Sequence, residues 1–190
     1  MVGLLARAFL AKEPGATVVH DPRVVWNTQS EIARGGGRAH AARTGHAFLK
    51  QAMRDTGAIY GGEMSAHHYF RDFMCCDSGM IPWLMVAELL SSTGKPLAEL
   101  VAEARTAFPS SGEINFRVVN PANAIQRVSN ALKHKADAEG LTDGLSLTFP
   151  DWRFNLRASN TEPLLRLNVE TLGDREKLAY HVKQVAALID

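Results

Sequence analysis

Cysteine is scarce in this sequence of 190 residues, which has only two, Cys75 and Cys76, adjacent in the chain. Neighbouring cysteines match neither a disulfide framework nor the spaced pairs of a zinc knuckle. This excludes a small secreted domain held together by disulfides. We expect a reducing, cytoplasmic setting, in which such thiols remain free.

Long apolar runs and an excess of charge of one sign are missing too. No stretch approaches the about 20 apolar residues that span a bilayer. The 21 basic and 20 acidic residues leave a net charge of +1, so neither a nucleic acid nor a membrane surface is indicated as a partner. The N-terminal stretch MVGLLARAFLAKEPG has no basic region before its apolar part and no clear cleavage site, which favours an amphipathic helix over a signal peptide.

The remaining composition, 46% hydrophobic and 22% charged, is that of an ordinary globular chain with room for one large or two small domains. In its first half, helix and strand signals alternate, which predicts a layered α/β domain with a mainly parallel sheet over residues 1–106. Thr28 and Glu31 have the spacing of a capping box, which indicates a helix start. Strand signals lie at 17–21, 38–43 and 58–63, and further helix signals at 44–57, 77–92 (buried, with Pro82 in its first turn) and 96–104.

The pattern changes near residues 106–113, which we interpret as a linker to a second domain at 113–190. Asn120 and Pro121 are a typical N-cap and first residue of a helix, which we expect to run to Gly140. Strand signals at 113–119 and 141–171 and a second helix signal at 174–189 complete this part. Together they predict a small α+β domain whose antiparallel sheet packs on two helices.

The segment RASNTEPLLR (157–166) interrupts two strand patterns with polar residues and a proline. Arg157 offers a planar fork of donors that suits phosphate. Ser159, Asn160 and Thr161, with the loop amides, would add hydrogen bonds to the same anion. We expect a phosphate-binding loop here; the alternative is a polar hairpin turn beside a solvated arginine.

The stretch GGEMSAHHYF (61–70) follows an apolar strand pattern. Glu63 and Ser65 are two positions apart, so on an extended segment they face the same way and suit vicinal sugar hydroxyls. The glycines allow the backbone to approach a ligand closely, and a histidine here would donate to phosphate or move protons. The alternative is a surface loop whose acid and imidazoles are only solvated.

A third segment, RTGHAFLK (43–50), opens a predicted helix through a Thr-Gly turn. Amide groups at a helix start favour an anion, although such a turn is more often a simple cap. His46 and His20 are weak signals on their own. The cysteine pair is interpreted as packing, not as a redox or metal site.

Taken in order, RTGH, GEMSAHHYFRD, DSGMIP and RASNTEPLLR resemble the C-terminal half (domains 3 and 4) of the bacterial phosphomannomutase/phosphoglucomutase enzymes, in the α-D-phosphohexomutase superfamily. The resemblance covers nearly the whole chain, with residues 1–106 similar to domain 3 and residues 113–190 similar to domain 4. It implies an isomerase of phosphotransferase type that interconverts hexose 1-phosphate and hexose 6-phosphate through a bisphosphosugar.

The resemblance also implies roles for individual residues. Glu63 and Ser65 would hold sugar hydroxyls, and His67 and His46 would lie near the reacting region. Arg23, where relatives usually have lysine, is a further possible substrate contact. The residues expected to bind the non-transferring phosphate are Arg157, Ser159, Asn160 and Thr161. The letters EMS favour mannose and glucose phosphates, with glucosamine phosphate as the alternative substrate.

Some parts of the family pattern have no counterpart here: the phosphoserine nucleophile, and the first strand and Asp-rich metal loop of domain 3. The intact enzymes use Mg²⁺ and a hexose bisphosphate activator, but we expect no metal ligand in this chain and no mutase activity from it alone. Ala66 stands where relatives usually have glycine, so a positive φ there would be costly.

The missing strand would leave strand edges and apolar helix faces open, which predicts self-association. The competing hypothesis is a non-catalytic sugar-phosphate binding module, or the product of a truncated gene.

Overall fold

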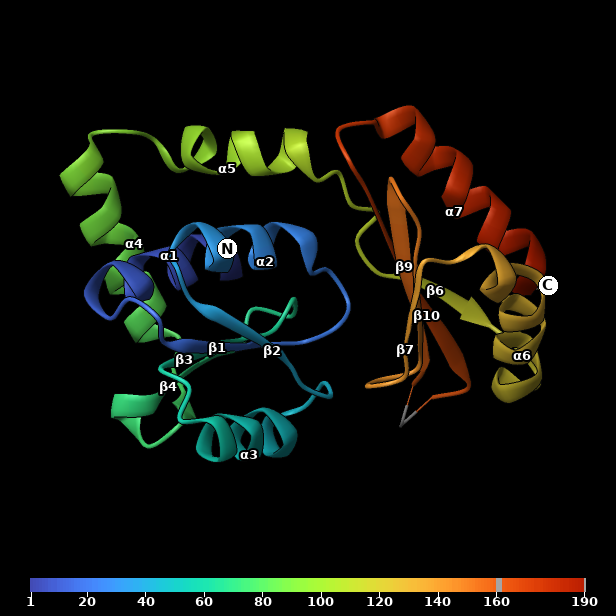
Figure 1. The fold of residues 1–190 in the computed structure, drawn as a ribbon, viewed down its shortest axis with the longest axis horizontal. Helices are drawn as coiled ribbons and strands as arrows, with labels where there is room; N and C mark the ends of the chain where they lie inside the picture. Colours follow the sequence, from blue (N-terminus) through green and yellow to red (C-terminus); the bar gives the residue numbers. More distant parts are fainter. Residues whose placement is uncertain (160–161, 190) are drawn as a thin grey trace. The chain divides into compact units, whose positions relative to one another are not determined.

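The computed structural model describes residues 1–159 and 162–189, whose elements are traced in Figure 1. The chain forms two compact units, residues 1–104 and residues 105–190. Each unit has its own apolar core. Among the described residues, no helix combines the length and the apolar composition needed to cross a bilayer.

A five-stranded sheet forms the centre of the first unit, in the order β2-β1-β3-β4-β5. β1 runs parallel to β2 and β3, which confirms the predicted α/β layer. β4 and β5 extend the sheet with antiparallel pairings that no sequence pattern indicated. The strands are β1 (Thr17–His20), β2 (Arg38–Ala41), β3 (Tyr60–Gly62), β4 (His68–Phe70) and β5 (Cys76–Asp77).

Helices cover both faces of this sheet, with α1 and α2 on one face and α3 on the other (Figure 1). Val18 and Val19 of β1 show why two cores form, because successive side chains of a strand point to opposite faces. Val18 packs in the core that includes α1 and α2, and Val19 in the core that includes α3. The helices are α1 (Val2–Lys12), α2 (Trp26–Arg34), α3 (His46–Thr56), α4 (Met80–Thr93), α5 (Leu97–Ala107) and the short 3-10 helix η1 (Arg71–Phe73).

Two helix predictions in this unit are wrong in part. α2 begins at Trp26, and no side chain caps it, so the capping-box spacing that starts at Thr28 lies inside the helix. α4 was predicted to be buried, but only Pro82 is buried in it. Ile81, Met85 and Val86 pack on one side against the core of the first unit, whereas Trp83 and Leu84 are 62% and 55% exposed.

The second unit is built on an antiparallel sheet in the order β6-β10-β9-β8-β7, which confirms the predicted α+β domain. Asn120 caps α6, as predicted, because its side chain accepts a hydrogen bond from the Asn123 amide at 3.0 Å. The elements are β6 (Ile114–Arg117), α6 (Pro121–Leu132), the 3-10 helix η2 (Lys133–Lys135), β7 (Ala138–Gly140), β8 (Leu145–Thr148), β9 (Trp152–Ala158), β10 (Leu164–Thr171) and α7 (Arg175–Ile189).

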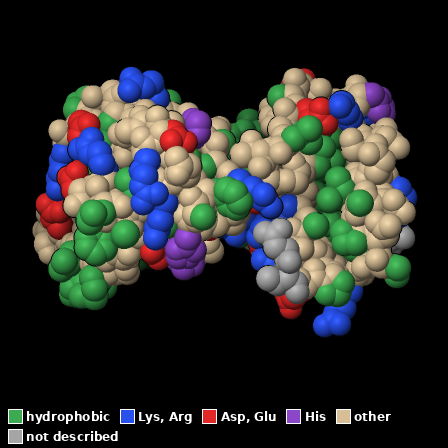
Figure 2. All heavy atoms as spheres, turned by 90° about the horizontal axis from the view of Figure 1, so that it is seen from below, with side chains coloured by type: hydrophobic (Ala, Val, Ile, Leu, Met, Phe, Trp, Pro, Cys, Tyr) green, Lys and Arg blue, Asp and Glu red, His purple; other side chains and the backbone are tan. Residues whose placement is uncertain are grey.

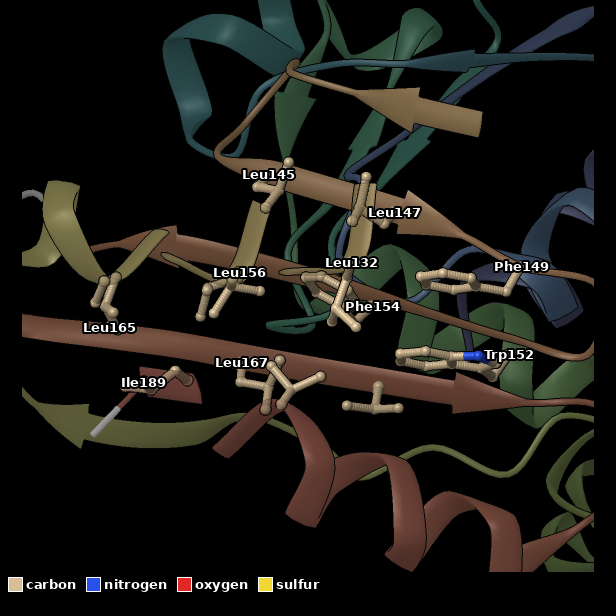
Figure 3. Packing of buried hydrophobic residues seen from close by; sticks show 14 residues of the cluster. Leu132, Leu145, Leu147, Phe149, Trp152, Phe154, Leu156, Leu165, Leu167 and Ile189 are labelled. Carbon is tan, nitrogen blue, oxygen red and sulfur yellow. The ribbon is translucent and has the colours of Figure 1, made fainter. Parts of the chain in front are cut away.

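One face of the second sheet is apolar and packs against α6 and α7 (Figure 3). The alternation along β9 produces this face: Phe154 and Leu156 lie in the core, whereas Arg153 and Arg157 point to the opposite face. The polar face of the sheet therefore carries the guanidinium groups of Arg153 and Arg157.

The helix predicted for residues 120–140 is too long. α6 ends at Leu132, the last of its residues buried in the core, and a 3-10 turn follows. Residues 138–140 instead form β7 and pair with β8 at the edge of the sheet. The helix signal continued through residues of good helix propensity that tertiary pairing uses as a strand.

Candidate functional site

Loops that follow the three parallel strands of the first unit carry polar side chains. Asp21 and Arg23 come directly after β1, His46 lies beyond β2, and Glu63 comes directly after β3. The carboxyl ends of parallel strands meet at one edge of a sheet, and this is where α/β proteins commonly bind ligands. Residues about 40 positions apart in the sequence are in contact here.

The Arg23 guanidinium lies at the centre of this edge and is only 4% exposed. Its Nη2 donates to Asp21 Oδ2 at 2.6 Å, to Glu63 Oε2 at 3.4 Å and to Ser65 Oγ at 3.2 Å. The predicted substrate contact Arg23 is thus joined to the predicted sugar-binding pair. A guanidinium fixed between two carboxylates is held in one orientation and orients both acids in turn.

Asp21 organises the loops and was missed by the sequence analysis. Its carboxylate accepts from the Arg23 amide at 3.0 Å and from the Met64 amide at 2.7 Å, so it ties the loop after β1 to the loop after β3. The available signal was its position, an acid directly after a buried β-branched strand. That signal is weak, since a loop acid is usually solvated.

Glu63 and Ser65 lie side by side because a turn follows β3, whereas the prediction assumed an extended segment. Ser65 Oγ donates to Glu63 Oε2 at 3.1 Å, and Tyr69 Oη donates to Glu63 Oε1 at 2.7 Å. With Asp21 and Arg23, the group contains two acids and one guanidinium. This excess of acceptors favours neutral donors such as hydroxyl groups over a phosphate.

Gly61 and Gly62 serve packing in this structure. A Cβ at Gly61 would lie 2.9 Å from Met53 Sδ of α3, and a Cβ at Gly62 would lie 2.6 Å from Val2 Cγ1 of α1. Helices press on both faces of β3, so a side chain at either position would clash. The sequence interpretation, close approach of a ligand, is not needed to explain these glycines.

The loop after β3 closes tightly around Ala66. The Glu63 amide donates to the His67 carbonyl at 2.9 Å, and the Ala66 amide donates to the Glu63 carbonyl at 3.1 Å. Ala66 has φ +66°, in the left-handed region that favours glycine. This is the positive φ that the sequence analysis expected to be costly at alanine, and the turn that presents Ser65 is built around it.

Two histidines and a carboxylate form a second group at the same sheet edge. His46 Nδ1 lies 3.5 Å from Asp77 Oδ1, and His67 Nδ1 lies 3.5 Å from Asp77 Oδ2. The imidazole rings meet edge to face, with centroids 4.5 Å apart. Lys50 Nζ lies 3.9 Å from the same carboxylate. Figure 2 shows histidine side chains gathered on the surface of the first unit.

The surroundings of Asp77 favour its ionised form. Partial desolvation raises its pKa, but a backbone hydrogen bond, the charges of His46 and Lys50 and the contact with His67 together lower the pKa below its ordinary value. Asp77 lies in the motif DSGMIP but was not among the predicted site residues. Asp77 lies beside His67 because β4 and β5 pair with each other, and this pairing was not predicted.

A buried layer lies behind the surface groups. Tyr60 Oη and His68 Nδ1 share a hydrogen bond of 2.7 Å. Burial, then the positive charges of the N-terminal amine and His67, lower the pKa of His68 to about 4. A pocket of about 230 Å³ adjoins this layer, and its lining includes His20, Asp21, Asn27, Glu63, Met64 and His68.

The predicted phosphate loop joins β9 to β10 in the second unit. Arg157 ends up beside Arg166, its register partner on β10. The Ser159 amide donates to the Leu164 carbonyl at 2.8 Å and closes the hairpin. Asn160 and Thr161, the other two residues predicted to bind phosphate, lie outside the described residues.

Two arginines share one acid at this loop. Arg157 Nη2 donates to Glu113 Oε2 at 3.3 Å, and Arg166 Nη1 lies 3.5 Å from Glu113 Oε1. Asp143 Oδ2 lies 4.0 Å from Arg157 Nη1. These contacts are longer than the 2.7–2.9 Å typical of strong charge-assisted bonds.

Within the described residues, the buried Nε atoms of Arg157 and Arg166 have no hydrogen-bond partner. The arrangement is a pair of oriented guanidinium groups with unused donors. Arg166 was not predicted as a second cation. Its place opposite Arg157 on the same sheet face follows from strand alternation only once the register of β9 and β10 is known.

Known protein families match both units. Residues 1–108 match the family described as phosphoglucomutase/phosphomannomutase, alpha/beta/alpha domain III, and residues 113–188 match the phosphoglucomutase/phosphomannomutase C-terminal domain. The phosphomannomutases of Salmonella typhimurium and Escherichia coli are 56% and 55% identical to this chain over 190 residues. Each match covers 100% of this chain but 42% of the relative, so the chain spans less than half the length of these proteins.

Solved structures agree with this assignment. A phosphoglucomutase/phosphomannomutase family protein from Burkholderia thailandensis superposes with a TM-score of 0.83 at 28% identity, covering 99% of this chain and 40% of that one. A structure titled as a putative phosphomannomutase from Thermus thermophilus gives 0.74 at 18% identity, over 99% and 39% of the two chains, which supports the fold alone. The chain therefore belongs to the phosphoglucomutase/phosphomannomutase family, and its two units correspond to the family's domain III and C-terminal domain.

Proposed function

We propose that this chain recognises the sugar and the non-transferring phosphate in a phosphohexomutase that interconverts the 1-phosphates and 6-phosphates of mannose or glucose. The family and the phosphomannomutase relatives support this reaction class. The observation that carries the proposal is the Arg23–Glu63–Ser65 network, in which loops about 40 positions apart converge at the carboxyl edge of the sheet.

The sugar would bind at Glu63 and Ser65. Their oxygens lie 3.1 Å apart and are held by Tyr69 and Arg23, so they are ordered before a ligand arrives. A carboxylate beside a hydroxyl accepts from one sugar hydroxyl and exchanges a hydrogen bond with its neighbour. Because binding then orders few side chains, little conformational entropy is lost.

The non-transferring phosphate would bind at the hairpin between β9 and β10, through Arg157 and Ser159 with Asn160 and Thr161. An arriving phosphate would compete with Glu113 for the two guanidinium groups. The long contacts to Glu113 make that exchange favourable, since a dianion forms shorter charge-assisted bonds than those it replaces. Arg166 would contribute a second positive charge.

His67 and His46 would act beside the transferring phosphoryl group. Asp77 orients both rings through their Nδ1 atoms, and this leaves Nε2 of either ring available to hold or move a proton. Of the two, His67 is the stronger candidate for proton transfer, because it lies in the same loop as Glu63 and Ser65.

Magnesium is the ion implied by the family, and this chain does not fit it. Mg²⁺ prefers an octahedral shell of oxygen ligands. In residues 1–159 and 162–189, the one group of three or more His, Cys, Asp or Glu side chains close enough to share an ion has two histidines. An Mg²⁺ site would therefore belong to the part of the relatives that this chain does not match.

The chemical step of the reaction would likewise depend on the part of the relatives that this chain does not match. A phosphoserine donor, a bisphosphosugar intermediate and a hexose bisphosphate activator would involve residues beyond the matched 42%. We expect the 190-residue chain alone to show no turnover in a coupled assay with glucose 1-phosphate and glucose 1,6-bisphosphate. Turnover by the pure chain would contradict this division of roles. A cytoplasmic location is part of the proposal, since both cysteines are free.

Isothermal titration with glucose 1-phosphate, mannose 1-phosphate and glucosamine 1-phosphate tests recognition and ranks the three sugars. Glu63→Gln should weaken binding by at least about tenfold, because a charged acceptor contributes about 1.5–3 kcal/mol. Glu13→Gln, which alters an exposed acid paired with Arg71 in the same unit, should leave binding unchanged. Absence of binding, or equal curves for parent and Glu63→Gln, would refute the proposal. If the chain alone bound all three sugar phosphates with equal affinity, the alternative of a non-catalytic sugar-phosphate binding module would be favoured.

A further inference from the structure

We propose that His46, His67 and Asp77 form a binding site for a borderline divalent transition metal ion, with Zn²⁺ as its best representative. The three side chains come from α3, the loop after β3, and β5. The fold thus brings together residues that are spread over 32 positions of the sequence. Their ligand atoms all lie within 4.8 Å of one another. No sequence spacing typical of a metal motif connects them.

The distances suit a tetrahedral ion. Ligand atoms bound to one zinc ion at 2.0–2.2 Å lie about 3.4 Å apart. Each histidine Nδ1 is already 3.5 Å from an oxygen of Asp77. A small rotation of the two rings, which are 48% and 45% exposed at their side chains, brings all three ligands onto one ion. The fourth position would face solvent.

The chemistry of the donors selects the ion. Two imidazoles with one carboxylate suit Zn²⁺, Co²⁺ and Ni²⁺, whereas Mg²⁺ prefers oxygen ligands and keeps its water. The site is thus different in kind from the Mg²⁺ site that the family implies. The carboxylate of Asp77 would supply the negative charge that balances part of the charge of the ion.

Lys50 is the cation that this ion would replace. Its Nζ lies 3.9 Å from Asp77 Oδ1, where it neutralises the carboxylate. A bound metal would repel Lys50 and displace it toward solvent. Lys50 therefore weakens metal binding, which gives the proposal a variant with an effect of the opposite sign.

Isothermal titration of the full chain with zinc chloride, in a buffer without phosphate, tests the site. We expect about one ion per chain, and His46→Ala or His67→Ala should each weaken binding by at least about tenfold. Lys50→Met should strengthen it several-fold. Titration with Co²⁺ should produce visible absorption bands that both histidine variants lose, and Mg²⁺ should give no heat signal at this site.

Two control variants separate this site from others that attract zinc. His134→Ala removes an exposed histidine on η2, and Cys76→Ser removes the thiol nearest the site in sequence. Both should bind Zn²⁺ like the parent. Circular dichroism checks that each variant is folded. Absence of Zn²⁺ binding, or binding that depends on Cys76 or His134 but not on His46 and His67, would overturn the proposal.

The consequence for activity rests on the proposed function, because a bound ion would occupy the two histidines assigned to the reacting region. Saturating Zn²⁺ should then weaken glucose 1-phosphate binding by the parent chain and not by His46→Ala. The titration with zinc chloride needs no sugar phosphate. A chain that binds Zn²⁺ but no sugar would therefore refute the proposed function and leave the metal site standing.

Discussion

Tyr60 of β3 and His68 of β4 are diagonal neighbours in the sheet, and the 2.7 Å hydrogen bond between Oη and Nδ1 is buried. Burial lowers the pKa of the imidazole to about 4 and raises the pKa of the phenol. The folded state therefore keeps His68 neutral at pH values where an unfolded chain would protonate it.

The first prediction concerns stability at acid pH. Because the pKa of His68 is lower in the folded state, its stabilising contribution is present above the ordinary value of 6.5 and is lost as the pH falls toward about 4. The free energy of unfolding should fall by on the order of 3 kcal/mol across this interval from this residue. Urea titrations at a series of pH values measure it.

His68→Gln provides the comparison, since glutamine keeps polar groups but does not titrate. The pH dependence of the variant should be flatter than that of the parent between pH 6.5 and 4. The imidazole resonances of His68 in the folded parent should titrate near pH 4 by NMR. If the stability of parent and variant fell equally between pH 6.5 and 4, or if His68 titrated near pH 6.5, the lowered pKa of His68 would be contradicted.

The second prediction uses the positive φ of Ala66. Ala66→Gly should raise the free energy of unfolding by about 1 kcal/mol, because glycine adopts the left-handed region without steric cost. A shift in Tm of roughly 2–4 °C follows for a chain of this size. Ala102→Gly, at an exposed position in α5, should instead destabilise the chain. Equal signs for the two substitutions would show that Ala66 is not strained.

The third prediction tests the arginine pair of the second unit. Arg157→Ala should weaken glucose 1-phosphate binding by roughly tenfold or more, since one charge-assisted contact is lost. Glu113→Gln should strengthen binding several-fold, because it releases both Arg157 and Arg166 from a competing acid. Arg175→Ala, on the exposed start of α7, serves as the control.

Isothermal titration measures all three variants. Opposite effects of Arg157→Ala and Glu113→Gln are the signature of a guanidinium that exchanges an internal acid for a ligand. If both substitutions weakened binding alike, Glu113 would be positioning Arg157 for the phosphate rather than competing with it.

The fourth prediction is self-association of the first unit. All four residues of the edge strand β2 are exposed, and α4 exposes Trp83 and Leu84. Light scattering coupled to size exclusion should give a mass above that of one chain. The double substitution Trp83→Ser and Leu84→Ser should lower that mass, whereas Leu141→Ser in the second unit should not. A parent chain that is already monomeric would contradict this prediction.

Much of the architecture follows from local pattern. The parallel strands of the first unit, the antiparallel sheet of the second and the Asn120 cap were all predictable, because each depends on periodicity or on capping residues close in sequence. Where tertiary contacts overrode propensity, prediction failed. The length of α6 and the start of α2 are such cases.

Individual residues of the candidate site could be predicted from the sequence, but the contacts between distant residues could not. Glu63 and Ser65 are close in sequence, so their contact is local, although a turn forms it and not the extended segment that the spacing argument assumed. The contacts of Arg23 with Glu63, and of Arg157 with Glu113, join residues at least 40 positions apart. No local pattern encodes such pairs, because they depend on which strand ends and hairpins the fold brings together.

The position of β1 in its sheet has a consequence for how the first unit folds. β1 precedes both of its partners in the sequence and pairs on both sides, with β2 and with β3, where Val18 is opposite Tyr60. Neither edge of this strand can be satisfied until its later partners have left the ribosome. Such non-local pairing slows folding, and both edges of β1 stay open for pairing with other strands until β2 and β3 are in place.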